Sequence, residues 1–189
     1  RVCAWIVLIC MLLAAIPLSV SAEPEANGDV EVILLFDTSG SMNKSDPDKN
    51  GVRLSVEAAY QFVFNYPTNT NMFITVIPFD SYVYEGFKRV NVKDEKGRAE
   101  FSSQMDALMS GQVGDFKFWE NNTDTGTALE VAKKKLDASS VSKKAVILFT
   151  DGKIALTSKD NLKDEESVAK ALESSAALRD SGIHVYSIG

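Results

Sequence analysis

Four short stretches of the chain are almost continuously hydrophobic. They are residues 30–36 (VEVILLF), 71–79 (NMFITVIPF), 145–149 (AVILF) and 183–188 (IHVYSI). Hydrophobicity that continues from residue to residue, rather than alternating, is typical of strands covered on both faces, as in a parallel sheet. The pattern therefore predicts four buried strands.

The segments between these stretches carry hydrophobic residues at helical spacing. One face of residues 52–66 gathers Val52, Val56, Ala59, Val63 and Tyr66, and one face of residues 126–137 gathers Ala128, Leu129, Ala132 and Leu136. Lys133 and Lys134 fall on the opposite side of the second segment. Residues 164–180 open with three acids, which favour a helix N-terminus, and Gly182 follows as a typical helix end.

Strands that alternate with helices predict an α/β domain that is doubly wound. Such a domain has a mostly parallel, twisted sheet with helices on both faces and right-handed crossovers. Residues 81–90 follow the second strand too soon for a crossover helix, so we expect one antiparallel edge strand there. The remaining segments are expected to be a charged loop (91–100), a short helix (101–109) and an irregular stretch (111–122).

The N-terminus has the features of a targeting segment. A hydrophobic run from Val2 to Leu18 ends in small residues, and Val20 and Ala22 have the spacing that a signal peptidase accepts. We therefore predict three segments: a secretory signal peptide cut after Ala22 (1–22), a short linker (23–28) and one domain (29–189). The alternative is an N-terminal membrane anchor, since the run is nearly long enough to span a bilayer. Either interpretation places the domain outside the cytoplasm.

Composition and charge narrow the class of partner. Both cysteines lie within residues 1–22, so the domain would carry no disulfide and would depend on its core. With 45% hydrophobic residues in the chain, a full core can form. The net charge of −6, which becomes −7 when Arg1 leaves with the signal, argues against nucleic acid and favours a cation or a basic surface.

Two of the predicted strands lead into an aspartate. Asp37 ends the first strand (LLFDTSGS) and Asp151 follows the third (ILFTDGK). In doubly wound folds ligands bind at the carboxyl ends of the strands, so we expect both carboxylates in one crevice. Ser39 and Ser41 add two hydroxyls. Carboxylates and hydroxyls with no His or Cys nearby suit a hard divalent cation such as Mg²⁺.

Other interpretations of Asp37 stay open on these residues alone. An aspartic-protease turn would need a second Asp-Thr-Gly and an all-β chain, and a phosphatase-type nucleophile would need a second acid two residues on, where Ser39 stands. A cap or turn role would explain either aspartate by itself. The combination with the two serines favours the cation site.

Three motifs of the chain resemble those of the von Willebrand factor type A (VWA) domain. DTSGS (37–41) resembles its Asp-x-Ser-x-Ser signature, NNTDTGTAL (121–129) its threonine loop, and FTDG (149–152) its second aspartate turn. They occur in the family's order and spacing, and the resemblance spans residues 29–189. It implies a Rossmann-like fold.

The resemblance also implies a metal-ion-dependent adhesion site (MIDAS). Ser39, Ser41 and Thr123 would be hydroxyl ligands, with Asp37 and Asp151 acting largely through bound water. The cation would be Mg²⁺, with Mn²⁺ or Ca²⁺ as alternatives. An open coordination position would then take an acidic residue from a protein ligand.

The threonine loop departs from the family's pattern. Asn121 and Asn122 stand where the family often has Gly-Gly. The ligand from this loop is therefore expected to be Thr123, with Thr125 as the alternative.

The implied function is a secreted or cell-surface binding module without catalysis. Its contact with a membrane would be through the signal or anchor segment or through regions outside this chain. The family has a further helix and edge strand after the position of Gly189, so we expect Ile183, Val185 and Ile188 to be partly uncovered. One alternative is an assembly module of a larger surface complex in which the ion only stabilises the fold. A more remote one is an extracytoplasmic hydrolase that uses Asp37.

Three further features have competing interpretations. Residues 46–57 match a calcium-loop pattern with a glutamate in twelfth place, but no helix enters the loop, so a simple Asp-Pro turn is the alternative to a second cation site. His184 lies in a strand pattern and is expected to pack or hydrogen-bond rather than to catalyse. Phe116, Phe118 and Trp119 would either rim a binding face or form a satellite core.

Overall fold

A five-stranded sheet with the order β3-β2-β1-β6-β7 forms the centre of the computed structural model. The long strands are β1 (Val30–Asp37), β2 (Met72–Phe79), β6 (Lys143–Phe149) and β7 (His184–Ile188). All of these pair in parallel, and β3 (Val90–Asn91) pairs antiparallel with β2 at the edge. The predicted mostly parallel sheet is confirmed.

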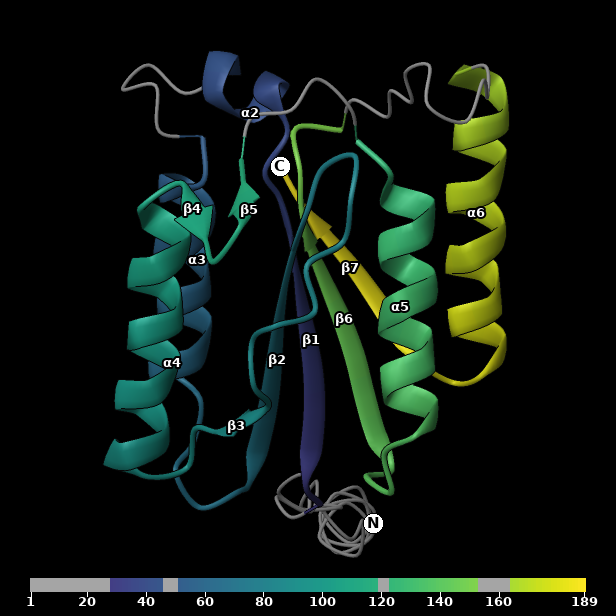
Figure 1. Cartoon of the computed structure of the whole chain (residues 1–189). Helices are drawn as coiled ribbons and strands as arrows, with labels where there is room; N and C mark the ends of the chain where they lie inside the picture. Colours follow the sequence, from purple (N-terminus) through teal and green to yellow (C-terminus); the bar gives the residue numbers. More distant parts are fainter. Residues whose placement is uncertain (1–27, 46–50, 119–122, 153–163) are drawn as a thin grey trace, which may run out of the picture.

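Helices cover both faces of this sheet (Figure 1). They are α3 (Arg53–Phe64), α4 (Glu95–Met109), α5 (Thr125–Asp137) and α6 (Asp164–Asp180), whereas α2 (Gly40–Ser45) lies beyond the carboxyl end of β1. In Figure 1, α3 and α4 lie on one side of the sheet and α5 and α6 on the other, so the doubly wound arrangement is as predicted.

The structure describes residues 28–45, 51–118, 123–152 and 164–189. The predicted signal peptide and most of the linker therefore lie outside the described residues, as do residues 46–50 of the calcium-loop pattern. Within the described ranges, no helix is both long enough and hydrophobic enough to cross a membrane.

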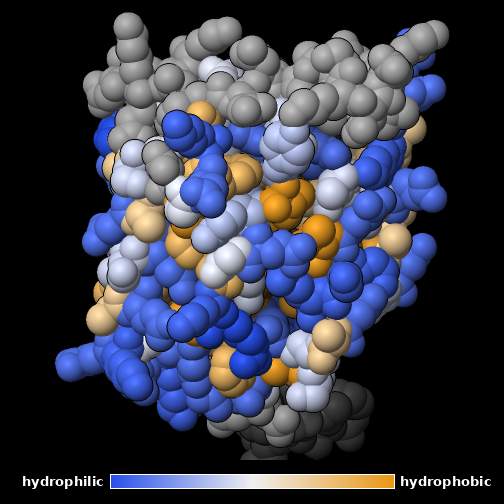
Figure 2. All heavy atoms as spheres, in the orientation of Figure 1, coloured by the Kyte–Doolittle hydropathy of each residue, from blue (hydrophilic) through white to orange (hydrophobic). Residues whose placement is uncertain are grey.

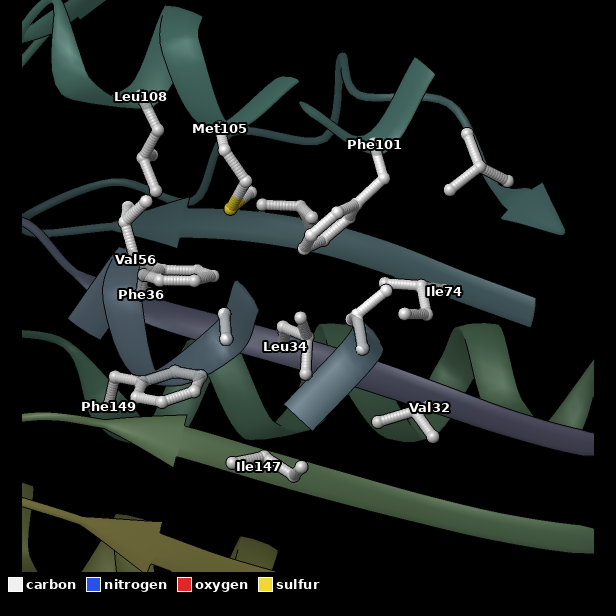
Figure 3. Packing of buried hydrophobic residues seen from close by; sticks show 14 of the residues in the cluster. Val32, Leu34, Phe36, Val56, Ile74, Phe101, Met105, Leu108, Ile147 and Phe149 are labelled. Carbon is white, nitrogen blue, oxygen red and sulfur yellow. The ribbon is translucent and has the colours of Figure 1, made fainter. Parts of the chain in front are cut away.

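The hydrophobic runs supply two cores because successive side chains of a strand point to opposite faces. On the α3 and α4 side the largest buried residues include Leu34, Phe36, Ile74, Phe101, Met105 and Phe149. Figure 3 shows the rings of Phe36 and Phe149 beside each other, with their centroids 4.7 Å apart. The other face of β1 packs Ile33 and Leu35 against the buried residues of α5. A strand buried on both faces needs this continuous pattern.

The edge strand is shorter than the sequence predicted. Within residues 81–90 the structure has one bridge, between Phe79 and Val83, and ladder pairing begins only at Val90. The rest of the connection between β2 and β3 runs along this edge of the sheet, beside β2, where the Tyr84 N–H donates to the Pro78 carbonyl at 2.9 Å (Figure 1). The surface in this view is mostly hydrophilic, with hydrophobic residues gathered near its middle (Figure 2).

The charged loop predicted over residues 91–100 is wrong, because α4 begins at Glu95. Asp94 caps the helix by accepting a hydrogen bond from the Gly97 backbone N–H at 2.9 Å. A Cβ at position 97 would lie 1.6 Å from the Asn91 carbonyl oxygen, so only glycine fits this close approach. The Asp94 cap therefore allows a helix to begin in a segment whose many charged residues had suggested a loop.

Residues 111–122 are more regular than predicted over their described part. They contain a hairpin of β4 (Gln112–Val113) and β5 (Phe116–Lys117), with Gly114 at a positive φ of 59° in its turn. Phe118 is buried and Phe116 packs against the same core, which supports the satellite-core interpretation for these two rings. Trp119 lies outside the described residues.

The last strand is covered on one face. Ile183 is buried against Leu178 of α6, so its predicted exposure is wrong. Val185 is partly buried, whereas Tyr186 and Ile188 on the opposite face are exposed. His184 is exposed as well, with its ring centroid 6.3 Å from that of Tyr186, so its predicted packing is limited to this contact.

One ion pair fastens the β2–β3 connection to the sheet. The Arg89 guanidinium donates to both carboxylate oxygens of Glu31, at 2.6 and 3.1 Å. The hydroxyl of Ser139 also donates to Glu31, and the guanidinium lies over the ring of Phe73 at 3.7 Å. The Glu31 side chain is 6% exposed and that of Arg89 44% exposed. A buried carboxylate thus depends on a half-exposed cation.

We expect Arg89→Met to lower the free energy of unfolding by about 2 kcal/mol, because it leaves the Glu31 carboxylate buried without its cation. Urea denaturation measures the change. The control is Lys133→Met, which removes an exposed helical pair with Asp137 and should cost about 0.5 kcal/mol or less. Equal losses in the two variants would contradict this account of Glu31.

Candidate metal centre

The strand order brings three chain segments to one edge of the sheet. β1 lies between β2 and β6, with Asp37 level with Phe79 and Phe36 level with Phe149. Because the three strands are parallel, the residues that follow them emerge at the same edge. Asp37, Asp80 and Asp151 therefore all lie at the carboxyl ends of adjacent strands.

Asp37 is fully buried at the end of β1. One carboxylate oxygen accepts the backbone N–H of Ser39 at 2.9 Å, and the other accepts the hydroxyl of Thr150 at 2.8 Å. The next residue, Thr38, fixes the turn by donating both its N–H and its hydroxyl to the Phe79 carbonyl. The carboxylate is thus held in place from β1, β2 and β6.

A chain of hydrogen bonds continues from this turn to the second aspartate. The hydroxyl oxygens of Ser39 and Ser41 lie 3.0 Å apart, and the Ser41 hydroxyl donates to Asp151 at 3.3 Å. Ser41 and Asp151 are 110 positions apart in the sequence. Four of the five residues predicted for the site are therefore brought together.

Thr123, the fifth residue, is buried just before α5. The next residue, Asp124, donates its backbone N–H to the Asp80 carbonyl at 2.8 Å, which attaches this loop to the end of β2. Within the described part of the chain, no hydrogen bond joins the Thr123 side chain to the other four residues. Thr125, the alternative, begins α5, and its buried hydroxyl finds no partner among the described residues.

The charge of Asp37 is not balanced by its hydrogen bonds. Burial raises the pKa of its carboxyl above the ordinary value, and the nearby charge of Asp151 acts in the same direction. The hydrogen bonds from Ser39 and Thr150 oppose this shift, but these donors are neutral. A bound cation would offset the negative charge that remains.

The donor set fits a hard divalent cation. The atoms near Asp37 are carboxylate and hydroxyl oxygens, which are the ligands that Mg²⁺, Mn²⁺ and Ca²⁺ prefer. In the described ranges, no group of three or more His, Cys, Asp and Glu side chains is placed to hold a metal. A cation at this edge would therefore depend on the hydroxyls of Ser39 and Ser41 as well as on the carboxylates.

Two residues of this edge were missed in the sequence. Asp80 is fully buried, with Oδ1 accepting the Tyr82 N–H at 3.1 Å, and Thr150 supports Asp37. The pattern VIPFD offered the same signal for Asp80 as LLFD did for Asp37, namely an aspartate directly after a hydrophobic strand. Thr150 carried no comparable signal, because a threonine at a strand end is ordinary.

The sequence matches the model of a known protein family. The sequence model of the von Willebrand factor type A domain matches residues 32–153, which includes all five predicted site residues. Among curated protein sequences, none matches this chain.

Several solved structures are similar to this one. Proximal thread matrix protein 1 from the mussel byssus has a TM-score of 0.59 and 23% identity, covering 86% of this chain and 36% of that one. BatB from Bacteroides thetaiotaomicron, described as a conserved hypothetical protein, has a TM-score of 0.58 and 20% identity, covering 85% and 66%. The manganese-loaded TRAP protein of Plasmodium vivax has a TM-score of 0.57 and 21% identity, covering 86% and 58%. The chain thus spans less than two thirds of each of these proteins, and the likeness shows the fold.

We expect Asp37→Asn to raise the melting temperature of the cation-free protein near neutral pH. The folded protein raises the pKa of this carboxyl above its ordinary 3.8, so the folded state binds the proton more tightly and stability falls as pH rises through this range. Asparagine removes the charge and keeps an oxygen acceptor for the Ser39 N–H.

Melting curves in chelator at about pH 7 and about pH 4 measure this effect, and the advantage of the variant should shrink at the lower pH. Asp106→Asn, at an exposed position of α4, controls for the loss of one negative charge. An Asp37→Asn protein that melts below the wild type at neutral pH would contradict the charge imbalance.

Proposed function

The chain belongs to the von Willebrand factor type A family, and from this premise we propose that it is a binding module that holds a divalent cation at a MIDAS and, through it, a protein ligand. The proposed ligands are the hydroxyls of Ser39, Ser41 and Thr123, with Asp37 and Asp151 around them. The observation that carries this proposal is the hydrogen-bond chain from Asp37 through Ser39 and Ser41 to Asp151.

The cation is proposed to be Mg²⁺, with Mn²⁺ or Ca²⁺ as alternatives. The TRAP protein was crystallised with manganese, and a second structure of the mussel protein has zinc in its MIDAS motif, at 24% identity to this chain. Zinc commonly takes nitrogen and sulfur ligands, whereas the oxygen atoms described here favour the harder ions.

The hydrogen bonds of Asp37 suit a role through bound water. Both of its carboxylate oxygens already accept a hydrogen bond, from Ser39 and from Thr150, which holds them in place for the water of a hydrated cation. Neutral hydroxyls as direct ligands leave the cation electrophilic. When bound, the cation supplies a Lewis-acid position for a carboxylate of the protein ligand.

A non-catalytic role is proposed because the two carboxylates that accept hydrogen bonds from the hydroxyls of this edge, Asp37 and Asp151, are also the groups that the cation would need. The hydroxyl of Ser41 is shared between Ser39 and a carboxylate that the cation would also need. His184 is exposed on β7.

The pilus adhesin SpaC from Lactobacillus rhamnosus GG shares the fold with a TM-score of 0.56 and 17% identity, covering 86% of this chain and 24% of that one, which is consistent with a binding role. A hydrolase using Asp37 is the remote alternative, and steady turnover of a phosphoester or peptide library would support it.

The proposed location is extracytoplasmic, either secreted or at the cell surface. This rests on the hydrophobic segment 1–22, proposed as a signal peptide that precedes the linker 23–28 and the domain 29–189. Nucleic acid is not proposed as a partner, given the net charge of −6. A second cation at residues 46–57 stays a prediction, and Glu57, its twelfth residue, is paired in α3 with Arg53 at 2.9 Å.

Calorimetric titration of Mg²⁺ into the wild type, Thr123→Val and Thr125→Val tests the cation site. We expect Thr123→Val to weaken Mg²⁺ binding about tenfold, because one oxygen contact to a charged group is lost. The folds should be unchanged, since valine matches the shape of threonine. If Thr125→Val is the damaging change, the ligand is Thr125. If the wild type binds no Mg²⁺, the proposal fails.

The protein-ligand part of the proposal is tested with Mn²⁺ as the cation and an acidic peptide as the probe. An open coordination position holds an exchangeable water, which enhances the relaxation of bulk water protons. We expect a glutamate-containing peptide to reduce this enhancement and its glutamine counterpart to leave it unchanged. An ion that only stabilises the fold, as in the assembly-module alternative, would show no such difference.

A further inference from the structure

Lys170 of α6 reaches the turn that carries Thr123. Its ammonium donates to the hydroxyl of Thr127 at 2.6 Å and lies 3.9 Å from a carboxylate oxygen of Asp124. Thr127 in turn donates its hydroxyl to Asp124 at 2.7 Å, and its backbone N–H to the same carboxylate at 2.9 Å. A charged relay thus runs from α6 to the residue directly after Thr123.

The aliphatic part of the Lys170 side chain is packed as closely as its ammonium group. A Cβ on Gly126 would lie 2.7 Å from the Cγ of Lys170 and 2.9 Å from its Cδ. The side chain therefore lies flat across the first turn of α5, where glycine leaves room for it. The ammonium also lies 3.7 Å from Glu130 one turn further along. These contacts hold the lysine in one place at a surface where lysines are usually mobile.

The position of Asp124 matters because this residue directly follows the proposed ligand Thr123 in the sequence. The Asp124 carboxylate caps α5 by accepting the Thr127 backbone N–H, and the Asp124 backbone N–H donates to the Asp80 carbonyl. The loop is thus held between the end of β2 and α6. Among the described residues, the Asp124 charge would without the ammonium be balanced by neutral donors and by the helix N-terminus.

We propose that Lys170 is a positioning residue for the cation site, which it serves by clamping the Asp124 turn so that Thr123 is held in place; this inference rests on the proposed function. The lysine acts through Thr127 and Asp124 and does not touch the cation. Its positive charge alone would oppose cation binding, so a loss of affinity on its removal has to come from the lost clamp.

The test is Mg²⁺ titration calorimetry on four single variants of the whole chain. We expect Lys170→Met to weaken Mg²⁺ binding about tenfold, and Lys170→Arg, which keeps the charge, to stay within about twofold of the wild type. Thr127→Val, which breaks the relay but keeps every charge, should weaken binding to a similar extent. Lys133→Met is the matched control, because it removes one lysine charge from α5 away from this turn. Melting temperatures in chelator show that the variants are equally folded.

The double variant Lys170→Met with Thr127→Val separates a relay from two independent effects. If both residues act through one relay, the double variant should bind Mg²⁺ no more weakly than the weaker-binding single variant, whereas independent losses of affinity would add. If Lys170→Met does not fold, Thr127→Val carries the test, and wild-type affinity in that variant overturns the inference. Equal Mg²⁺ affinities of Lys170→Met and Lys133→Met overturn it too, while the cation site itself stands. A wild type that binds no Mg²⁺ overturns the proposed function and this inference together.

Discussion

The burial of Asp37 at the end of the central strand is the constraint on which the rest of this structure depends. A carboxylate fully removed from water needs hydrogen-bond donors from every side. They come from Ser39 in its own turn and from Thr150 at the end of β6, while Thr38 secures the same turn to β2. Only a parallel sheet with β1 in the middle places these strand ends side by side. The fold therefore accommodates a charge that costs it stability, and the proposed cation explains why that charge is retained.

The second requirement is that the threonine loop stays in place, although it is far from Asp37 in the sequence. The backbone N–H of Asp124 is bound at the end of β2, and its side chain caps α5. Lys170 adds a contact from α6, the helix that comes after Asp151 in the chain. The turn at Asp124 is thus supported from the end of β2 and from α6, and under the proposal for Lys170 a change in α6 would alter the position of Thr123.

Much of this was predictable from the sequence, and the reasons are physical. Continuous hydrophobic runs such as 30–36 identify strands buried on both faces, and an aspartate directly after such a run identifies the edge where ligands bind. Asp37 and Asp151 were predicted in this way, and Ser39 and Ser41 were predicted because they follow Asp37; the structure brings these four residues together. The residues missed are those whose role depends on three-dimensional neighbours: Thr150 and Lys170 are ordinary residues until the strand order and the helix packing bring them to Asp37 and Thr127. The start of α4 was missed for a different reason, since one cap at Asp94 outweighed a highly charged composition.

The central claim is that the oxygen atoms at the carboxyl edge of the sheet surround one divalent cation. Crystals of the protein soaked in Mn²⁺ test it most directly, because anomalous scattering locates manganese without reference to the protein atoms. The account predicts one strong anomalous peak at coordination distance, about 2.2 Å, from the hydroxyl oxygens of Ser39 and Ser41. The hydroxyl oxygen of Thr123 should lie at coordination distance from the same peak. A strong peak only at another place, such as residues 46–57, or no peak at this edge in a fully soaked crystal, would contradict it.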